Sequence, residues 1–281
     1  MSFTPDLPAY FARIGLPGPH PPTLATLHAI ASAHVRAIPF ENLDVLLGRG
    51  VDLEPAVIEQ KLVRDRRGGY CFEQNTLLLH VLAALGFAVT PLSARVRVGR
   101  PRDFTPARTH LFVRVELDGR PWLADVGVGA LSPTAALRLD SEDEQATPHE
   151  PRRIVRAGRW DGGLRGPEAV LYHQVRFADG WHDVCELTLE EMPEIDRVVG
   201  NWYTSTHPRS HFKDRLIVAR ANDAGRLTLV NRELAQRDRA GHATTRVIGD
   251  PDELLAVLAS EFGIHVPAGT RFACPALADW S

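Results

Sequence analysis

The spacing of apolar residues changes once along this chain, and this change constrains the fold more than any other feature of the sequence. Before Gly86 the apolar residues recur every three or four positions; between residues 23 and 38, for example, Leu27 and Val35 fall on one helical stripe. Beyond Gly86 apolar and polar residues alternate instead, most clearly between residues 110 and 117. Helices followed by antiparallel strands indicate an α+β fold.

Three helices are expected before Gly86. The first covers residues 23–38 and ends at Pro39, because proline cannot continue a helix. The second begins at Pro55, a residue type favoured in the first helical turn. The third begins near Cys71 and ends at Gly86, which suits the left-handed position after a helix. Three helices joined by short loops predict a helical bundle.

The rest of the chain is expected to form strands and then a smaller mixed unit. Residues 140–168 are rich in charge, glycine and proline, so loops between strands are expected there. A helix is expected from Asp250, a capping residue, to Gly263. Strands are expected at residues 93–98, 110–117, 122–126, 172–177, 184–189, 216–220 and 227–231. The chain is thus expected to have three parts, residues 1–86, 87–200 and 201–281.

Composition and charge exclude several classes of protein. The 281 residues carry a net charge of −3, so no large field of one sign would attract nucleic acid or an anionic membrane. The first residues lack the pattern of a secretory signal, and no apolar run could span a bilayer. The three cysteines are an odd number without metal-ligand spacing. They predict no disulfide framework and no metal site, and they favour a reducing cytoplasm.

Cys71 lies in the densest group of chemically versatile residues, the segment 66–75 with the sequence RRGGYCFEQN. Two glycines allow a sharp turn, after which the cysteine falls in the first turn of an apolar helix. The unpaired N–H groups and the dipole of that turn favour a thiolate over a thiol. A buried structural cysteine beside a turn is the alternative, and the segment alone fits both. Cys185 and Cys274 fit only the structural interpretation.

A predicted hairpin places a histidine beside an aspartate. If Asp118 and Gly119 form the centre of a tight turn, the register gathers the apolar residues on one face and sets Asp125 diagonal to His110 on the other. Diagonal neighbours lie about 7–8 Å apart, within reach of a carboxylate–imidazole hydrogen bond. A slip of one residue would turn the carboxylate to the apolar face, where it is costly. With Cys71 as nucleophile, the pair would complete a catalytic triad.

Four sets of residues in a fixed order add a more specific signal: residues 38–43 (IPFENL), 67–75 (RGGYCFEQN), 109–110 with 125–127 (TH and DVG), and 201–208 (NWYTSTHP). Together they resemble the arylamine N-acetyltransferase family. Residues 67–75 resemble its active-site signature, and residues 38–43 resemble the motif upstream of it. Residues 109–110 and 125–127 match the positions of its other triad members, and residues 201–208 resemble a later segment. The similarity extends from the first helices to at least Phe212. Transglutaminases and related thiol hydrolases share the cysteine-first order, but not all four motifs.

The resemblance implies both a fold and a reaction. The fold would be an N-terminal helical bundle, a central antiparallel β-barrel and a C-terminal α/β lid, with a Cys–His–Asp core like that of cysteine proteases and transglutaminases. In a ping-pong reaction, Cys71 would take acetyl from acetyl-CoA, and an arylamine, arylhydrazine or hydrazide would then attack the thioester. His110 would act as the base and Asp125 would orient it. By position, Phe40, Val96, Thr109 and Val128 would line the acceptor pocket, and Tyr203 would lie near the coenzyme.

One position departs from the family pattern. Many members carry an aromatic residue three positions after the triad aspartate, where this chain has Val128. The resemblance therefore implies the chemistry, but it does not fix the size of the pocket or the preferred amine. Two other enzymes remain as alternatives: an amide synthase of the same lineage, which joins an acyl chain to an arylamine, and a thiol hydrolase, in which water replaces the amine. A binding module without activity would have no need of the triad.

Two further features have structural interpretations. Glu41 and Arg67 are expected to pair, either bracing the cysteine loop or as a solvated surface pair. The sequence Gly127-Val128-Gly129 is too short for a phosphate-binding loop, so a turn at a strand end is expected.

Overall fold

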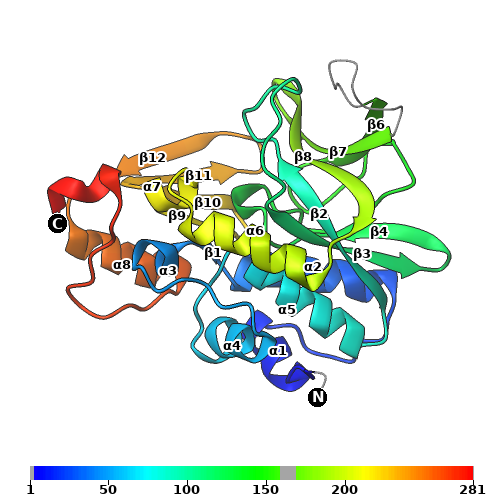
Figure 1. The fold of residues 1–281 in the computed structure, drawn as a ribbon, viewed down its shortest axis with the longest axis horizontal. Coiled ribbons are helices and arrows are strands. Elements are labelled where there is room, and N and C mark those ends of the chain that lie inside the picture. The colour runs from blue at the N-terminus through cyan, green and yellow to red at the C-terminus, as the bar shows by residue number, and fades with distance from the viewer. Residues whose placement is uncertain (1–2, 159–168, 281) are drawn as a thin grey trace.

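The structure is a computed structural model that describes residues 3–158 and 169–280, and its architecture is α+β (Figure 1). The three helices expected before Gly86 are present as α2, α4 and α5. The α4 helix runs on into a π-helical turn (Gln60–Arg64). The helices of this part are α1 (Leu7–Ile14), α2 (Leu24–Ala37), α3 (Leu43–Leu46), α4 (Pro55–Glu59) and α5 (Cys71–Ala84).

Local chemistry explains where the main helices begin. The Thr23 hydroxyl accepts the Thr26 N–H at 3.3 Å and caps α2. Glu73, in the first turn of α5, accepts the Tyr70 N–H at 3.0 Å and so satisfies a donor at the helix start. Residues 71–78 of α5 are all buried, so this helix lies inside the protein rather than on its surface.

Seven antiparallel strands form the central sheet, in the order β5-β4-β3-β2-β8-β7-β6. Its edge strands β5 and β6 approach each other, and the sheet curls into a nearly closed barrel above α5 (Figure 1). Its strands are β2 (Ala88–Val96), β3 (His110–Leu117), β4 (Arg120–Ala124), β5 (Leu137–Arg138), β6 (Arg152–Gly158), β7 (Ala169–Phe177) and β8 (Gly180–Glu191).

The β3–β4 hairpin has the predicted register. Val113 pairs with Ala124 and Val115 with Trp122, and these residues pack with the helices. Part of the other face of the hairpin is also buried, because Phe112 lies in the barrel interior. On that face His110 and Asp125 are buried, whereas Glu116, near the turn, is exposed.

The expectation of loops throughout residues 140–168 is wrong for residues 152–158, which form β6. The alternation of apolar and polar residues that predicts a strand is broken here, because Arg152 occupies an inward-facing position in place of an apolar residue. Its side chain is 0% exposed. A buried arginine is tolerated only where carboxylates or carbonyls receive it. Part of the same expectation, residues 159–168, lies outside the described residues.

A second antiparallel sheet, β1-β9-β10-β11-β12, lies beside the barrel (Figure 1). The hairpin expected around residues 221–225 is present as β9 and β10, and the helix expected from Asp250 is α8, with Gly263 left-handed at its end. The sequence did not indicate α6. The remaining α-helices and strands are β1 (Phe40–Glu41), α6 (Glu194–Thr206), α7 (His211–Asp214), β9 (Ile217–Ala221), β10 (Gly225–Val230), β11 (Glu233–Asp238), β12 (Ala243–Val247) and α8 (Pro251–Phe262).

Candidate active site

Cys71 is the first residue of α5, as the sequence predicted, and it is only 4% exposed. The turn before it requires glycine because the backbone passes close to its neighbours. A Cβ on Gly68 would lie 2.1 Å from the Pro39 carbonyl oxygen, and one on Gly69 would lie 2.7 Å from Glu73 Oε2. The turn therefore fits tightly between β1 and the first turn of α5, and it fixes the thiol at the helix N-terminus.

A buried network of charged side chains holds the cysteine loop. Arg67 Nη2 lies 2.7 Å from Glu41 Oε1, with side-chain exposures of 12% and 0%. Lys61 contacts Asp44 and Glu73 at 2.6 Å each, and Arg67 also reaches Asp44 at 3.3 Å. Because Glu73 belongs to α5 and Arg67 to the loop, the network ties the two together. Glu41 and Arg67 thus brace the cysteine loop, and the alternative of a surface pair is wrong.

His110 and Asp125 meet as the hairpin register predicted. His110 Nε2 lies 2.7 Å from Asp125 Oδ2, and the side chains are 1% and 2% exposed. Burial alone would lower the pKa of His110, but the charge of Asp125, their hydrogen bond and a hydrogen bond with Cys71 raise the pKa above its usual value. Because Asp125 occupies Nε2, Nδ1 is the ring nitrogen that is left for Cys71. A protonated ring beside the thiol follows at neutral pH.

Asn75 is part of this arrangement, although the sequence analysis missed it. Its Nδ2 donates to Asp125 Oδ1 at 2.9 Å and to the Leu111 carbonyl at 2.6 Å, while its Oδ1 accepts the Val126 N–H at 3.0 Å. Asn75 therefore fixes the carboxylate from the helix that also carries Cys71. The available signal was its spacing of four residues from the cysteine, which places the two on one helix face.

Gly127 lies directly against the cysteine. Its N–H donates to Asp125 Oδ1 at 2.9 Å, and a Cβ at this position would lie 2.7 Å from Cys71 Cα. The expected turn after the strand is present, and it continues into a 3-10 turn (Gly129–Leu131). Only glycine allows this approach of the turn to the backbone of the nucleophile.

A chain of buried hydrogen bonds supports the cysteine loop from behind. The Tyr10 hydroxyl bonds His34 Nδ1 at 2.9 Å, and His34 Nε2 bonds Gln74 Oε1 at 2.9 Å. Gln74 Nε2 then donates to the Pro39 and Gly69 carbonyls at 3.0 and 2.8 Å. Burial, which outweighs the Gln74 hydrogen bond, lowers the pKa of His34 to about 3, so the ring is neutral. This histidine therefore has a structural role.

Two of the residues expected to line a substrate pocket lie beside the cysteine. Phe40 packs in one cluster with Cys71, and the Thr109 carbonyl accepts a hydrogen bond from Cys71 Sγ at 3.4 Å. Val96 and Val128 pack instead, half-buried, against the barrel interior. Their roles toward substrate stay predictions.

Tyr203 lies on α6, which covers the cysteine loop. The Tyr203 ring is half-buried and stacks on His207, with ring centroids 4.5 Å apart. On the inner side of α6, a Cβ on Gly200 would lie 2.7 Å from the Phe72 ring. The place of Tyr203 near a coenzyme also stays a prediction.

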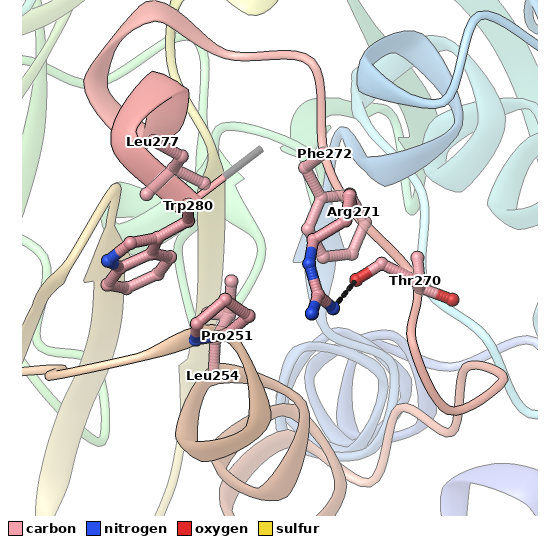
Figure 2. Close-up of a pocket in the computed structure, with 7 residues that line it drawn as sticks. All are labelled: Pro251, Leu254, Thr270, Arg271, Phe272, Leu277 and Trp280. Carbon is pink, nitrogen blue, oxygen red and sulfur yellow. Dashed lines mark hydrogen bonds between the residues drawn. The ribbon is translucent and has the colours of Figure 1, made fainter.

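Within residues 3–158 and 169–280, no group of three or more His, Cys, Asp or Glu side chains could hold a metal ion. Figure 2 shows a pocket of the C-terminal part, lined by seven residues that include Phe272 and Trp280, and none of them is a predicted site residue. In the same described ranges, no helix combines the length and apolarity needed to cross a membrane.

A thiol at a helix N-terminus beside a buried imidazole–carboxylate pair defines the class of Cys–His–Asp thiol enzymes. Within that class, a family profile described as N-acetyltransferase matches residues 23–271. The chain belongs to the arylamine N-acetyltransferase family, and it is an acetyltransferase of that family.

Relatives with known sequences and structures agree with this assignment. The arylamine N-acetyltransferase of Mycolicibacterium smegmatis is 44% identical over 266 residues, which cover 93% of this chain and 92% of that protein. The solved structure of the M. smegmatis enzyme has a TM-score of 0.87 at 41% identity and covers 98% of each chain. The Mycobacterium marinum arylamine N-acetyltransferase, solved in complex with CoA, has a TM-score of 0.84 at 41% identity over 92% of this chain and 93% of that one.

Proposed function

We propose that the protein transfers an acetyl group from acetyl-CoA, through an acyl-Cys71 intermediate, to an arylamine, an arylhydrazine or a hydrazide. In this proposal Cys71 is the nucleophile, His110 the base and Asp125 the group that orients the base. One observation carries it. His110 Nε2 is held 2.7 Å from Asp125 Oδ2 in a buried site, which leaves the other ring nitrogen for the thiol.

The first half-reaction begins from a thiolate beside an imidazolium. The raised pKa of His110 keeps the ring protonated at neutral pH, and in this proposal Cys71 enters the step as the thiolate. The Cys71 sulfur attacks the thioester carbonyl of acetyl-CoA, the CoA sulfur leaves, and His110 gives it the proton. Because one thioester replaces another, the step costs little free energy and the acetyl group stays activated.

The second half-reaction uses the same groups in reverse. The amine nitrogen attacks the acyl-cysteine, and the neutral His110 accepts its proton. The Cys71 sulfur then leaves as a thiolate, which restores the thiolate–imidazolium pair. Asp125 stabilises the protonated ring in both halves, and its own position is fixed by Asn75 and Gly127.

The proposed substrates rest on the relatives and on the surroundings of the cysteine. The M. marinum relative was solved with CoA, and the M. smegmatis relative is named an arylamine N-acetyltransferase. We place Phe40, Val96, Thr109 and Val128 along the acceptor pocket and Tyr203 near the coenzyme. The division into residues 1–86, 87–200 and 201–281 is part of the same proposal. Three unpaired cysteines also favour a reducing cytoplasm.

Mass spectrometry of the intact protein tests the proposal. After mixing with acetyl-CoA and no amine, the protein should gain one acetyl group, which maps to the peptide containing Cys71. Addition of an arylamine should then remove the acetyl group and yield the acetylated amine. Label on Cys185 or Cys274 would contradict the assignment of the nucleophile. Steady release of CoA that no amine accelerates would indicate a hydrolase instead.

A further inference from the structure

A buried cluster of charged residues outside the Cys–His–Asp site holds the loop that follows Asp125. The loop is residues 127–132, and the cluster consists of Glu150, Arg152 and Arg226, called the arginine clamp below. Arg152 lies on β6 of the barrel and Arg226 on β10 of the second sheet. The clamp therefore connects the two sheets at the loop.

Each arginine of the clamp binds a carbonyl at the end of the loop. Arg152 Nη1 donates to the Leu131 oxygen at 2.8 Å, and Arg226 Nη1 donates to the Ser132 oxygen at 2.9 Å. Glu150 Oε2 joins them, at 3.1 Å from Arg152 Nη2 and 2.7 Å from Arg226 Nη2. The two arginine side chains are 0% and 5% exposed. Charge-assisted bonds of this kind fix both distance and angle.

The clamp holds two positive charges against one negative charge. Burial would raise the pKa of Glu150, but its bonds to Arg226 and the charges of both arginines lower it to about 2, so the carboxylate is ionised. Burial and the charge of Arg226 lower the pKa of Arg152 to about 10, so it remains charged at neutral pH. Carbonyls at the end of a helical turn lack partners and carry partial negative charge. Glu150 balances only one of the two guanidinium charges. The Leu131 and Ser132 carbonyls thus provide acceptors for the remaining positive charge.

The other end of the same loop touches the nucleophile. A Cβ on Gly127 would lie 2.7 Å from Cys71 Cα, and a Cβ on Gly129 would lie 3.6 Å from the Phe40 ring. The Val128 N–H donates to Ser132 Oγ at 3.0 Å, which closes the loop on the residue that Arg226 binds. A displacement of Arg152 or Arg226 would therefore also move residues 127–129, which lie against Cys71 and Phe40.

We propose that Glu150, Arg152 and Arg226 are positioning residues for the amine half-reaction, which they serve by fixing the 127–132 loop where Gly127 lies against Cys71 and Gly129 against Phe40. The proposal rests on the double-displacement function proposed above. None of the three side chains contacts the reacting atoms. Their effect is on the position of the loop, and reaction rates respond steeply to misplacement of about 1 Å.

The test compares the two half-reactions in Arg226→Met. In a double-displacement reaction, kcat/KM for each substrate reports its own half-reaction. We expect kcat/KM for a small arylamine to fall on the order of tenfold, whereas kcat/KM for acetyl-CoA stays within about twofold. The order of preference among amines of different size should change as well. Arg226→Lys keeps the charge and should recover part of the loss.

Arg97→Met is the matched control, because Arg97 is also buried, binds Glu186 and donates to two loop carbonyls, those of Pro101 and Phe104. The Arg97→Met substitution should lower the melting temperature, but it should change kcat/KM for the arylamine and kcat/KM for acetyl-CoA by similar factors. The proposal would be overturned if Arg226→Met lowered kcat/KM for the arylamine and for acetyl-CoA equally, or changed neither. It would also be overturned if Arg97→Met lowered kcat/KM for the arylamine alone. If Arg226→Met does not fold, the same comparison is made with Arg226→Lys. A wild-type protein that forms no acyl-enzyme would instead contradict the proposed function.

Discussion

Asp125→Asn is the sharpest test of the His110 assignment, because the structure dictates how the new amide must lie. Asp125 Oδ1 accepts two N–H groups, from Asn75 and Gly127, at 2.9 Å each. The amide oxygen must take this place, since an NH₂ group there would face two donors. The NH₂ group then points at His110 Nε2, which becomes an acceptor. The ring proton moves to Nδ1, and His110 can no longer accept a proton on the side of Cys71.

The expected loss is large because the charge that stabilises the imidazolium disappears together with the correct tautomer. In a serine-protease triad the same change costs about 10⁴-fold. We expect acylation by acetyl-CoA to slow by on the order of 10³–10⁴-fold, or about 4–5.5 kcal/mol in the barrier. The size of the side chain and its two hydrogen bonds with Asn75 and Gly127 are kept, so the fold should remain.

The assay is a single-turnover measurement of CoA release after rapid mixing with acetyl-CoA, with the melting temperature measured in parallel. Asn75→Ala is a useful companion, because it leaves the carboxylate charged but loosens its position. Its loss should be smaller than that of Asp125→Asn. A fall of less than tenfold in Asp125→Asn, with the fold intact, would refute the reasoning that Asp125 sets the state of His110.

Three further predictions follow from contacts near the site. Inactivation by iodoacetamide should remain fast at mildly acidic pH, because the raised pKa of His110 keeps an imidazolium beside Cys71. The inactivation should be slower in His110→Ala, and identical pH profiles for the wild type and this variant would contradict the prediction. Val128→Phe should improve binding of small anilines by about tenfold at most and disfavour bulky amines, with acylation unchanged; slower acylation with the same amine preference would place the residue at the coenzyme instead. Because burial lowers the pKa of His34 to about 3, the unfolded chain binds a proton below pH ~6.5 that the folded chain does not. The contribution of His34 to stability should be full above that pH and fall by up to about 1.4 kcal/mol per unit below it. His173, whose pKa is also lowered to about 3, adds a slope of the same sign, so urea unfolding of His34→Gln should show a shallower pH dependence than the wild type.

Much of the site could be predicted from local patterns. A glycine turn before an apolar helix placed Cys71 at a helix N-terminus, and the Asp118-Gly119 turn fixed the register that brings Asp125 to His110. Both inferences rest on interactions between residues that are close in the chain, where backbone sterics and side-chain period leave few choices. The order of helices and strands was predictable for the same reason.

The helix α6 and the second sheet were harder to foresee. The α6 helix exposes Ile195 and Trp202, 65% and 60%, on one side and packs Gly200 against Phe72 on the other, so its pattern does not match that of a core helix. The second sheet takes β1 from the N-terminal part and pairs Phe40 with Ala219. No local rule predicts a pairing over such a distance in the chain.

The sequence by itself determined the period change at Gly86, the hairpin register and the nucleophile at a helix start, because each is a property of neighbouring residues. Only the tertiary structure decided that Asn75 fixes Asp125, that Gly127 lies against Cys71, and that Arg152 can be buried in a strand. The physical reason is the same in each case. A buried polar group is stable only where its partners converge on it, and those partners come from segments that the fold alone brings together.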